Sequence, residues 1–233
     1  MTYESASPSL IPPQAVPEGA HIFAERVQEL LDGRPKDEAT VAQALEGMEA
    51  MFDHIAAGLY TLASMLVGEG EESVRLVENA IATADVSACG DPVACRKTCR
   101  RALSTAAIEL LVRRSPGSLA APQSAAPAST CIGDDDLDAA DVRRAEFERM
   151  IAGPDRDRVR QWLRDLPTDV RTVFVLRAAA GFTAQETAAL LAAHGGASAA
   201  GWTAASVSET FRQGLCSLAS QLLQASVGQG SGI

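Results

Sequence analysis

The sequence is poor in aromatic residues and has no apparent β-strands. Phenylalanine, tyrosine and tryptophan together make up 4% of the 233 residues, whereas the whole apolar share is 47% and much of it is alanine. Alanine loses no side-chain entropy in a helix, so this composition favours helices. No stretch shows the alternation of apolar and polar residues, bounded by turn residues, that is typical of a strand. We therefore predict an all-α protein.

Positive charge is also scarce. The formal net charge is −10, and both halves of the chain are acidic, with −7 over residues 1–114 and −3 over residues 115–233. A chain of this charge does not attract nucleic acid through its overall field, because phosphate binding depends on lysine and arginine. Only a local basic patch leaves nucleic-acid binding open.

Long apolar runs and a signal peptide are missing. No run approaches the roughly 18 apolar residues that indicate a membrane-spanning helix. The first residues, "MTYESASPSLIPP", lack the basic-then-apolar layout of a secretory signal. We expect a cytoplasmic protein that does not contact a membrane. Its five cysteines, an odd number, are then expected to be thiols rather than a disulfide framework.

The sequence also lacks the marks of a catalytic, cofactor or metal site. Cys89, Cys95 and Cys99 form no C-x-x-C pair and have no histidine nearby, so ordinary thiols are favoured over a zinc site or a redox sensor. The acidic run at 134–141 lacks the ligand order of a calcium loop, and no glycine-rich phosphate loop is present. The histidines are scattered without a nucleophile beside them: His21, His54 and His194. We expect no enzyme activity, no cofactor and no metal.

Composition divides the chain into two helical domains and a linker. Residues 115–136 are rich in proline, serine, alanine and glycine without a period, which is typical of a flexible linker. The predicted divisions are a disordered tail at 1–19, a helical domain at 20–114, the linker at 115–136, a second helical domain at 137–225 and a tail at 226–233.

Turn and capping residues predict where several helices begin. "GDP" places Asp91 at an N-cap and Pro92 at the first position of a helix that runs to about Arg114. Further on, Thr183 and Glu186 have the spacing of a capping box and open a short helix. Thr203 is placed to cap the last helix.

At this point the residues resemble a known family. "WLRDLPTDVRTVFVLRAAAGFTAQETAALL" is similar to the start of region 4 of the extracytoplasmic-function sigma factors of RNA polymerase. The matching features are Leu166-Pro167 at a helix end, then Arg171, Phe174, Leu176 and Gly181 at the family's spacings. More weakly, "LYTLASMLVGEGEESVRLVENAI" and "CRKTCRRALSTAAIELLVRR" resemble region 2, and the resemblance covers about 50–114 and 145–225.

The resemblance implies partners and contact residues. Region 2 docks on RNA polymerase core and captures unpaired promoter DNA, and region 4 sets a recognition helix in the major groove. The residues in the place of the docking helix are Arg75, Leu76, Val77 and Glu78. The best basic surface for DNA lies on the helix before residue 114 and comprises Arg96, Lys97, Arg100 and Arg101. The outward positions of the last helix are Thr203, Ser206, Ser208, Thr210 and Arg212.

The sequence departs from the family in the same places. Between 203 and 222 the charged residues are Glu209 and Arg212, so the recognition helix is neutral, whereas phosphate and guanine contacts call for arginine and lysine. About ten residues, 193–202, stand where a turn of three or four is usual, and we expect Trp202 to pack back as an anchor. The basic surface has an alternative reading, as a solvated face that pairs with the chain's own acids such as "GEGEE" or "DDDLD".

Two functions follow from this pattern. The first is promoter-directed initiation with RNA polymerase core. The second is that of a degenerate homologue that works through protein contacts, for example with an anti-sigma factor or another regulator, and has weakened or lost DNA binding. In an acidic chain the linker also allows the two domains to fold together and mask both surfaces. A recognition helix whose Ser208 and Arg212 face is covered by protein excludes groove reading in that conformation.

Overall fold

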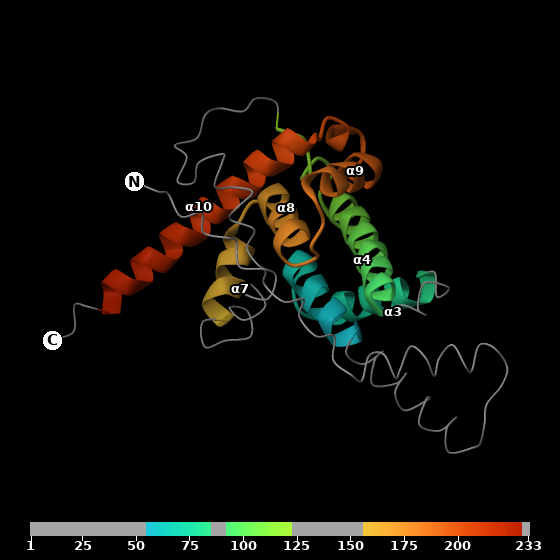
Figure 1. The fold of residues 1–233 in the computed structure, drawn as a ribbon, viewed down its shortest axis with the longest axis horizontal. Helices are drawn as coiled ribbons and strands as arrows, with labels where there is room; N and C mark the ends of the chain where they lie inside the picture. Colours follow the sequence, from blue (N-terminus) through green and yellow to red (C-terminus); the bar gives the residue numbers. More distant parts are fainter. Residues whose placement is uncertain (1–54, 85–91, 123–155, 230–233) are drawn as a thin grey trace, which may run out of the picture.

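The computed structural model describes residues 55–84, 92–122 and 156–229, and within these ranges every regular element is a helix (Figure 1). The elements are a helix over 55–67, α3 (Glu71–Thr83), α4 (Pro92–Arg114), α7 (Arg156–Asp165), α8 (Thr168–Ala178), α9 (Ala184–His194), the short 3-10 helix η2 (Ala197–Ala199) and α10 (Ala204–Gln229). The prediction of an all-α protein is confirmed for the described ranges. The predicted tail at 1–19 and the linker from 123 onward lie outside them, and α10 continues past residue 226, where the second tail was placed.

The helices begin where the capping residues predict. Helix α4 covers Pro92–Arg114, and its predicted N-cap, Asp91, lies outside the described residues. At the start of α9, Thr183 Oγ1 accepts a hydrogen bond from the Glu186 backbone N–H at 3.1 Å, and the Thr183 N–H donates to Glu186 Oε2 at 2.9 Å. This is a complete capping box. Between α8 and α9 the chain turns at Gly181, whose φ of 76° is a conformation that favours glycine.

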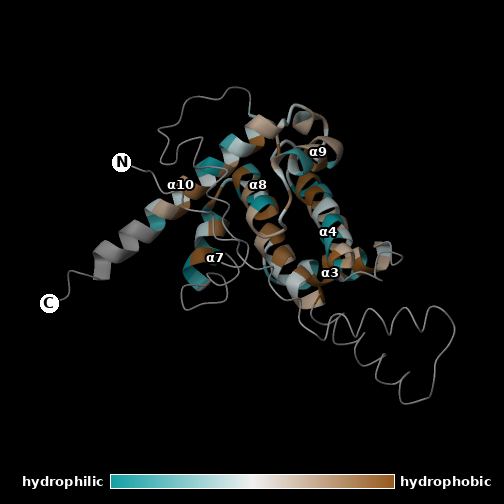
Figure 2. Cartoon of the chain, viewed as in Figure 1, coloured by the Kyte–Doolittle hydropathy of each residue, from teal (hydrophilic) through white to brown (hydrophobic). Residues whose placement is uncertain are grey.

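Helix α8 is the centre of the C-terminal half, which we define as residues 156–229. The five consecutive residues Thr172–Leu176 are buried, so α8 is covered on almost every side. The ring of Phe174 on α8 lies 5.0 Å from that of Trp162 on α7, edge to face, and 5.4 Å from that of Phe211 on α10. Figure 2 shows the apolar colouring of α8 between its neighbours. Three of the described aromatic residues, Trp162, Phe174 and Phe211, therefore pack together in this core.

The N-terminal half, defined as residues 55–84 and 92–122, packs the helix over 55–67 and α3 against α4. Its buried residues include Leu59, Leu66 and Leu103, and they form one continuous cluster with the buried residues of the C-terminal half. Residues 115–122, which the sequence assigned to the linker, lie against the C-terminal half. Within this stretch Leu119 is 0% exposed, and the Ala121 N–H donates to the Ser198 carbonyl at 3.0 Å. Apolar contacts override the loop-like composition of this stretch.

Candidate nucleic-acid interface

The basic surface on α4 lies on the outside of the molecule. Lys97 and Arg101 are exposed, and Arg96 and Arg100 are half-buried. The opposite side of α4 is apolar and buried, with Cys95, Cys99 and Leu103 facing the core, and this amphipathic pattern is what turns the basic residues outward. The predicted basic residues therefore do share one solvent-facing region of α4, as their spacing requires.

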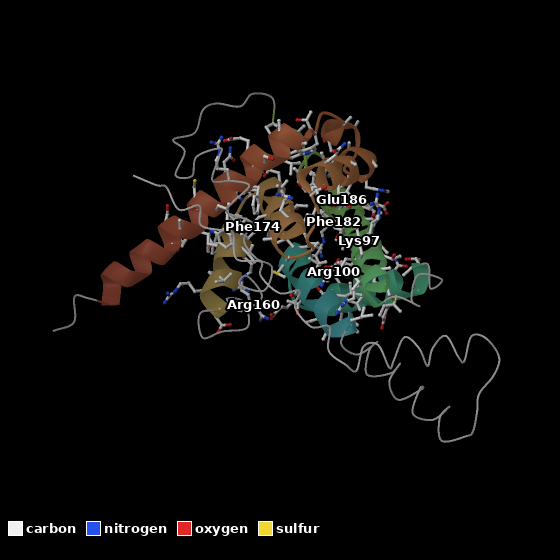
Figure 3. The ribbon with its side chains drawn as sticks, viewed as in Figure 1. Lys97, Arg100, Arg160, Phe174, Phe182 and Glu186 are labelled. Carbon is white, nitrogen blue, oxygen red and sulfur yellow. The ribbon has the colours of Figure 1, made fainter. Side chains whose placement is uncertain are left out.

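Lys97 is engaged with the chain's own acid. Its Nζ atom lies 3.0 Å from Glu186 Oε1 at the start of α9, and its side chain is 65% exposed (Figure 3). Hydrogen bonds from the Thr183 backbone N–H, and then from Lys97, lower the pKa of Glu186 to about 2. The carboxylate is thus ionised at neutral pH, and it is paired with the lysine that a DNA phosphate would contact.

At the end of α4, a second basic residue is paired with an acidic residue of the chain itself. Arg114 forms an ion pair with Glu72, an acid of the "GEGEE" stretch, and its Nη1 donates to the Val67 carbonyl at 3.3 Å. The favourable position of a cation near the carbonyl end of the helix over 55–67 adds to this pair. For Arg114 the alternative reading of the sequence, pairing with the chain's own acids, is confirmed.

The first two predicted contacts on α10 serve to cap that helix. Thr203 Oγ1 accepts from the Ser206 backbone N–H at 3.1 Å, and the Thr203 N–H donates to Ser206 Oγ at 2.9 Å. Thr203 therefore caps the last helix as predicted, with serine in the place where a capping box usually has glutamate or glutamine. Both hydroxyl groups already have partners in the protein, although Thr203 itself is exposed.

The other predicted contacts on α10 do not face solvent freely. Thr210 is 2% exposed, and Ser208 is half-buried. The side chain of Arg212 is 13% exposed and forms an ion pair with Glu209, one turn earlier on the helix. Groove reading requires side chains that reach base edges. In this conformation Thr210 is not accessible to DNA, and Ser208 and Arg212 are only partly accessible.

Residues that carry the resemblance build the core rather than a surface. Phe174 and Leu176 are fully buried, and Trp202 packs back against the body as predicted, with 5% exposure and its indole N–H bonded to the Leu119 carbonyl at 2.8 Å. Arg177, one residue after Leu176, donates from Nη1 to the Phe182 carbonyl at 2.8 Å and lies 5.3 Å from the centre of the Phe211 ring. The residues of the motif therefore hold the helices of this half together.

The predicted polymerase-docking residues are split between core and surface. Leu76 and Val77 are buried, with 7% and 8% exposure, because α3 packs on α4 through this face. Arg75 and Glu78 are exposed, and Arg75 pairs with Glu71 at 3.1 Å. The expectation that Leu76 and Val77 supply the apolar part of a docking surface is not met in this conformation. Their polar neighbours remain available to a partner.

The cysteines differ from the expectation of five thiols. Cys95 and Cys216 each take part in a disulfide bond, so the prediction is wrong for these two residues. Cys99 is a free thiol, and burial raises its pKa. An odd number of cysteines and an expected cytoplasmic location do not determine which sulfur atoms come together in space.

Among residues 55–84, 92–122 and 156–229, no three histidine, cysteine or acidic side chains come together in a way that would hold a metal ion. Within the same ranges no helix combines the length and apolarity needed to cross a membrane. His194, one of the scattered histidines, instead lies 3.2 Å from Glu109 through its Nδ1 atom.

The sequence did not predict which acidic residue pairs with the basic surface of α4. Glu186 was predicted as a cap, but its contact with Lys97 bridges residues 89 positions apart and has no local signal. Comparison with known proteins yields no match to a family model, a curated protein or a solved structure. The likeness to sigma factors therefore depends on the residues quoted above.

Proposed function

We propose that this chain is a sigma-factor-like transcription protein that binds RNA polymerase core and directs it to promoter DNA. The observation that carries the proposal is the unit of α8, α9 and α10. Its two successive helices each begin at a threonine cap, and both pack on the helix that contains Phe174. This is the order of helices that a sigma region 4 uses to present a recognition helix.

The basic surface of α4 supports the same function. It offers Arg96, Arg100 and Arg101 outside the core, at the position that the resemblance assigns to promoter capture. Phosphate contacts supply much of the affinity of DNA-binding proteins, and they are lost as salt rises. We expect these arginines to contribute through phosphates, because the α4 stretch from 96 to 114 contains no aromatic residue for base stacking.

The proposal is tested with purified chain, core polymerase and a labelled promoter fragment. At about 0.15 M salt the chain should bind core, and the complex should retain the fragment. Arg101→Gln should weaken retention several-fold and reduce the salt slope by about one, because one phosphate contact is lost. Arg164→Gln is the matched control, since Arg164 is an exposed arginine on α7 that donates a hydrogen bond to Gln161 of the same helix. Binding to core polymerase without any retention of promoter DNA would contradict the proposed role in initiation.

A second function is favoured by a specific observation, the covered face of α10. Thr210 is buried and Arg212 is paired to Glu209, so the helix that should read DNA is partly covered and its arginine is already neutralised. A degenerate homologue that acts through protein contacts, with an anti-sigma factor or another regulator, fits this arrangement. Its signature in the same experiment is stoichiometric co-purification of a partner protein with no promoter retained.

A further inference from the structure

The two halves are joined by contacts at both ends of α4. Near the start of α4, Lys97 pairs with Glu186 of α9, and near its end Glu109 lies 3.2 Å from His194 of the same helix. The two pairs join different positions of the same two helices, so α4 and α9 contact each other at two places. An additional ion pair joins Arg160 of α7 to Glu69, beyond the helix over 55–67.

An apolar clasp lies beyond the end of α4. Trp202 is inserted against residues 115–122, where its indole N–H bonds to the Leu119 carbonyl at 2.8 Å and Leu119 itself is fully buried. The Ala121 N–H completes the clasp through the Ser198 carbonyl. Burial of a tryptophan and a leucine contributes more than exposed ion pairs do. The clasp therefore supplies the strength of the contact, and the ion pairs fix its register.

The ionic end of this contact lies on the proposed DNA surface. Lys97 belongs to the basic surface of α4, and one of the donors of its ammonium group is already directed at Glu186. Glu186 is anionic at neutral pH and lies where a phosphate would bind Lys97. Its fixed carboxylate also repels an approaching nucleic acid. Closure of the two halves and DNA binding at Lys97 thus compete with each other.

We propose that the clasp and the Lys97–Glu186 pair form an intramolecular lock, in which Glu186 occupies the phosphate position of the DNA surface. The proposal rests on the proposed function and adds its regulation. In the locked chain α4 and α9 stay together, and loading onto polymerase and promoter separates them. Release exposes Lys97 and the start of α9 at the same time, because the two share one contact.

Zero-length carbodiimide cross-linking tests the lock directly. This reagent joins an amine to a carboxylate only when the two are in contact, and the chain has two lysines, Lys36 and Lys97, so the product is simple to map by mass spectrometry. We expect a Lys97–Glu186 cross-link in the free chain and at least a tenfold lower yield in the complex with core polymerase and promoter. Glu186→Gln, which keeps a capping side chain, is the control that abolishes the product.

A wedge variant tests the clasp by a second route. A Cβ added at Gly201 would lie in tight contact with the Ala121 Cβ, at 3.3 Å, and the branched side chain of Gly201→Val adds further bulk against residues 115–122, outside the central core. We expect a larger radius of gyration in X-ray scattering, loss of the cross-link and about tenfold tighter promoter binding with core. Leu119→Ser removes a buried side chain of the same clasp and serves as the second variant, with circular dichroism as the folding check.

The outcomes separate the lock from the proposed function. If the cross-link persists at full yield in a polymerase–promoter complex, the lock is overturned and the initiation function stands. If the wedge opens the chain but neither form binds polymerase or promoter, the initiation function is overturned, and the contact is a closure that serves another partner. If both clasp variants stay folded and compact with the cross-link intact, the two halves are one rigid unit and the lock is overturned.

Discussion

Gly214 is a single position where packing leaves no room for a side chain. A Cβ at residue 214 would lie 2.7 Å from an atom of the Phe174 ring, which is fully buried between α7, α8 and α10. Gly214→Ala therefore overpacks the core, and we expect a loss of about 1–3 kcal/mol in the free energy of unfolding. Urea denaturation followed by circular dichroism measures it.

Gly58 is the matched control for this substitution. It is an exposed glycine in the helix over 55–67, and a Cβ there would meet nothing within 4 Å. Gly58→Ala should stabilise by up to about 1 kcal/mol through helix propensity alone. Equal effects of the two substitutions, in either direction, would contradict the contact between Gly214 and Phe174 described here.

Some single residues were predictable, and the reason is local chemistry. Thr183, Thr203 and Pro92 act on backbone groups within one turn, so their roles can be inferred from the neighbouring sequence. Trp202 was predictable as an anchor because a lone tryptophan in a small-residue loop has few other places to lie. The partner acids of Lys97 and Arg212 were not, since the first is remote in sequence and the second depends on which face of α10 is covered.

At the scale of the element, α9 is the helix whose start combines a cap with a contact to the other half. The ordinary pKa of the Glu186 carboxyl is 4.5, and in the folded chain the Thr183 N–H and then Lys97 lower it to about 2. A group whose pKa is depressed on folding stabilises the folded state fully above its unfolded pKa. That contribution is lost as the pH falls from about 4.5 towards 2.

A pH series on Glu186→Gln tests this statement. Glutamine keeps a capping side chain but neither titrates nor pairs ionically with Lys97. We expect wild type to be more stable than the variant at pH 7 and the difference to shrink as the pH falls below about 4.5. Urea unfolding at pH 7 and at pH 3 measures the two differences. A gap that is independent of pH would show that the carboxylate is not held by these partners.

Elements were predicted better than their surroundings. The type and the starts of α9 and α10 follow from period and caps, whereas α3 shows the limit of such patterns. Val77 and Leu76 were placed on a docking surface, but they bury against α4, and Val74 is the residue left 44% exposed. Period alone identifies an apolar stripe, and the neighbouring helix decides whether a partner or the core covers it.

At the scale of the molecule, the continuous core predicts one cooperative transition. Both tryptophans lie in the C-terminal half, while circular dichroism reports on every helix. If the halves unfold together, thermal melting by fluorescence and by circular dichroism should coincide. Two domains on a flexible linker would instead give separate midpoints, so distinct transitions would contradict a shared core.

The molecule as a whole was the hardest scale to predict. Composition at 115–136 indicated a linker, and nothing in "SPGSLAAP" signals that Leu119 will be fully buried. A short apolar residue among serines and prolines has no period, so its burial depends wholly on a distant partner. The helical class was predictable because it is a sum of local preferences, whereas the contact between halves arises from a few long-range pairs.

The hydrogen bond from Trp202 to Leu119 also has a consequence for the order of synthesis. It joins residues 83 positions apart, so the ribosome releases Leu119 well before Trp202 exists. During that interval the nascent N-terminal half presents an apolar segment with no cover, the kind of surface that chaperones and aggregation partners recognise. Slowing translation between the two codons should therefore lower soluble yield, and a wild-type C-terminal half supplied in trans should restore it.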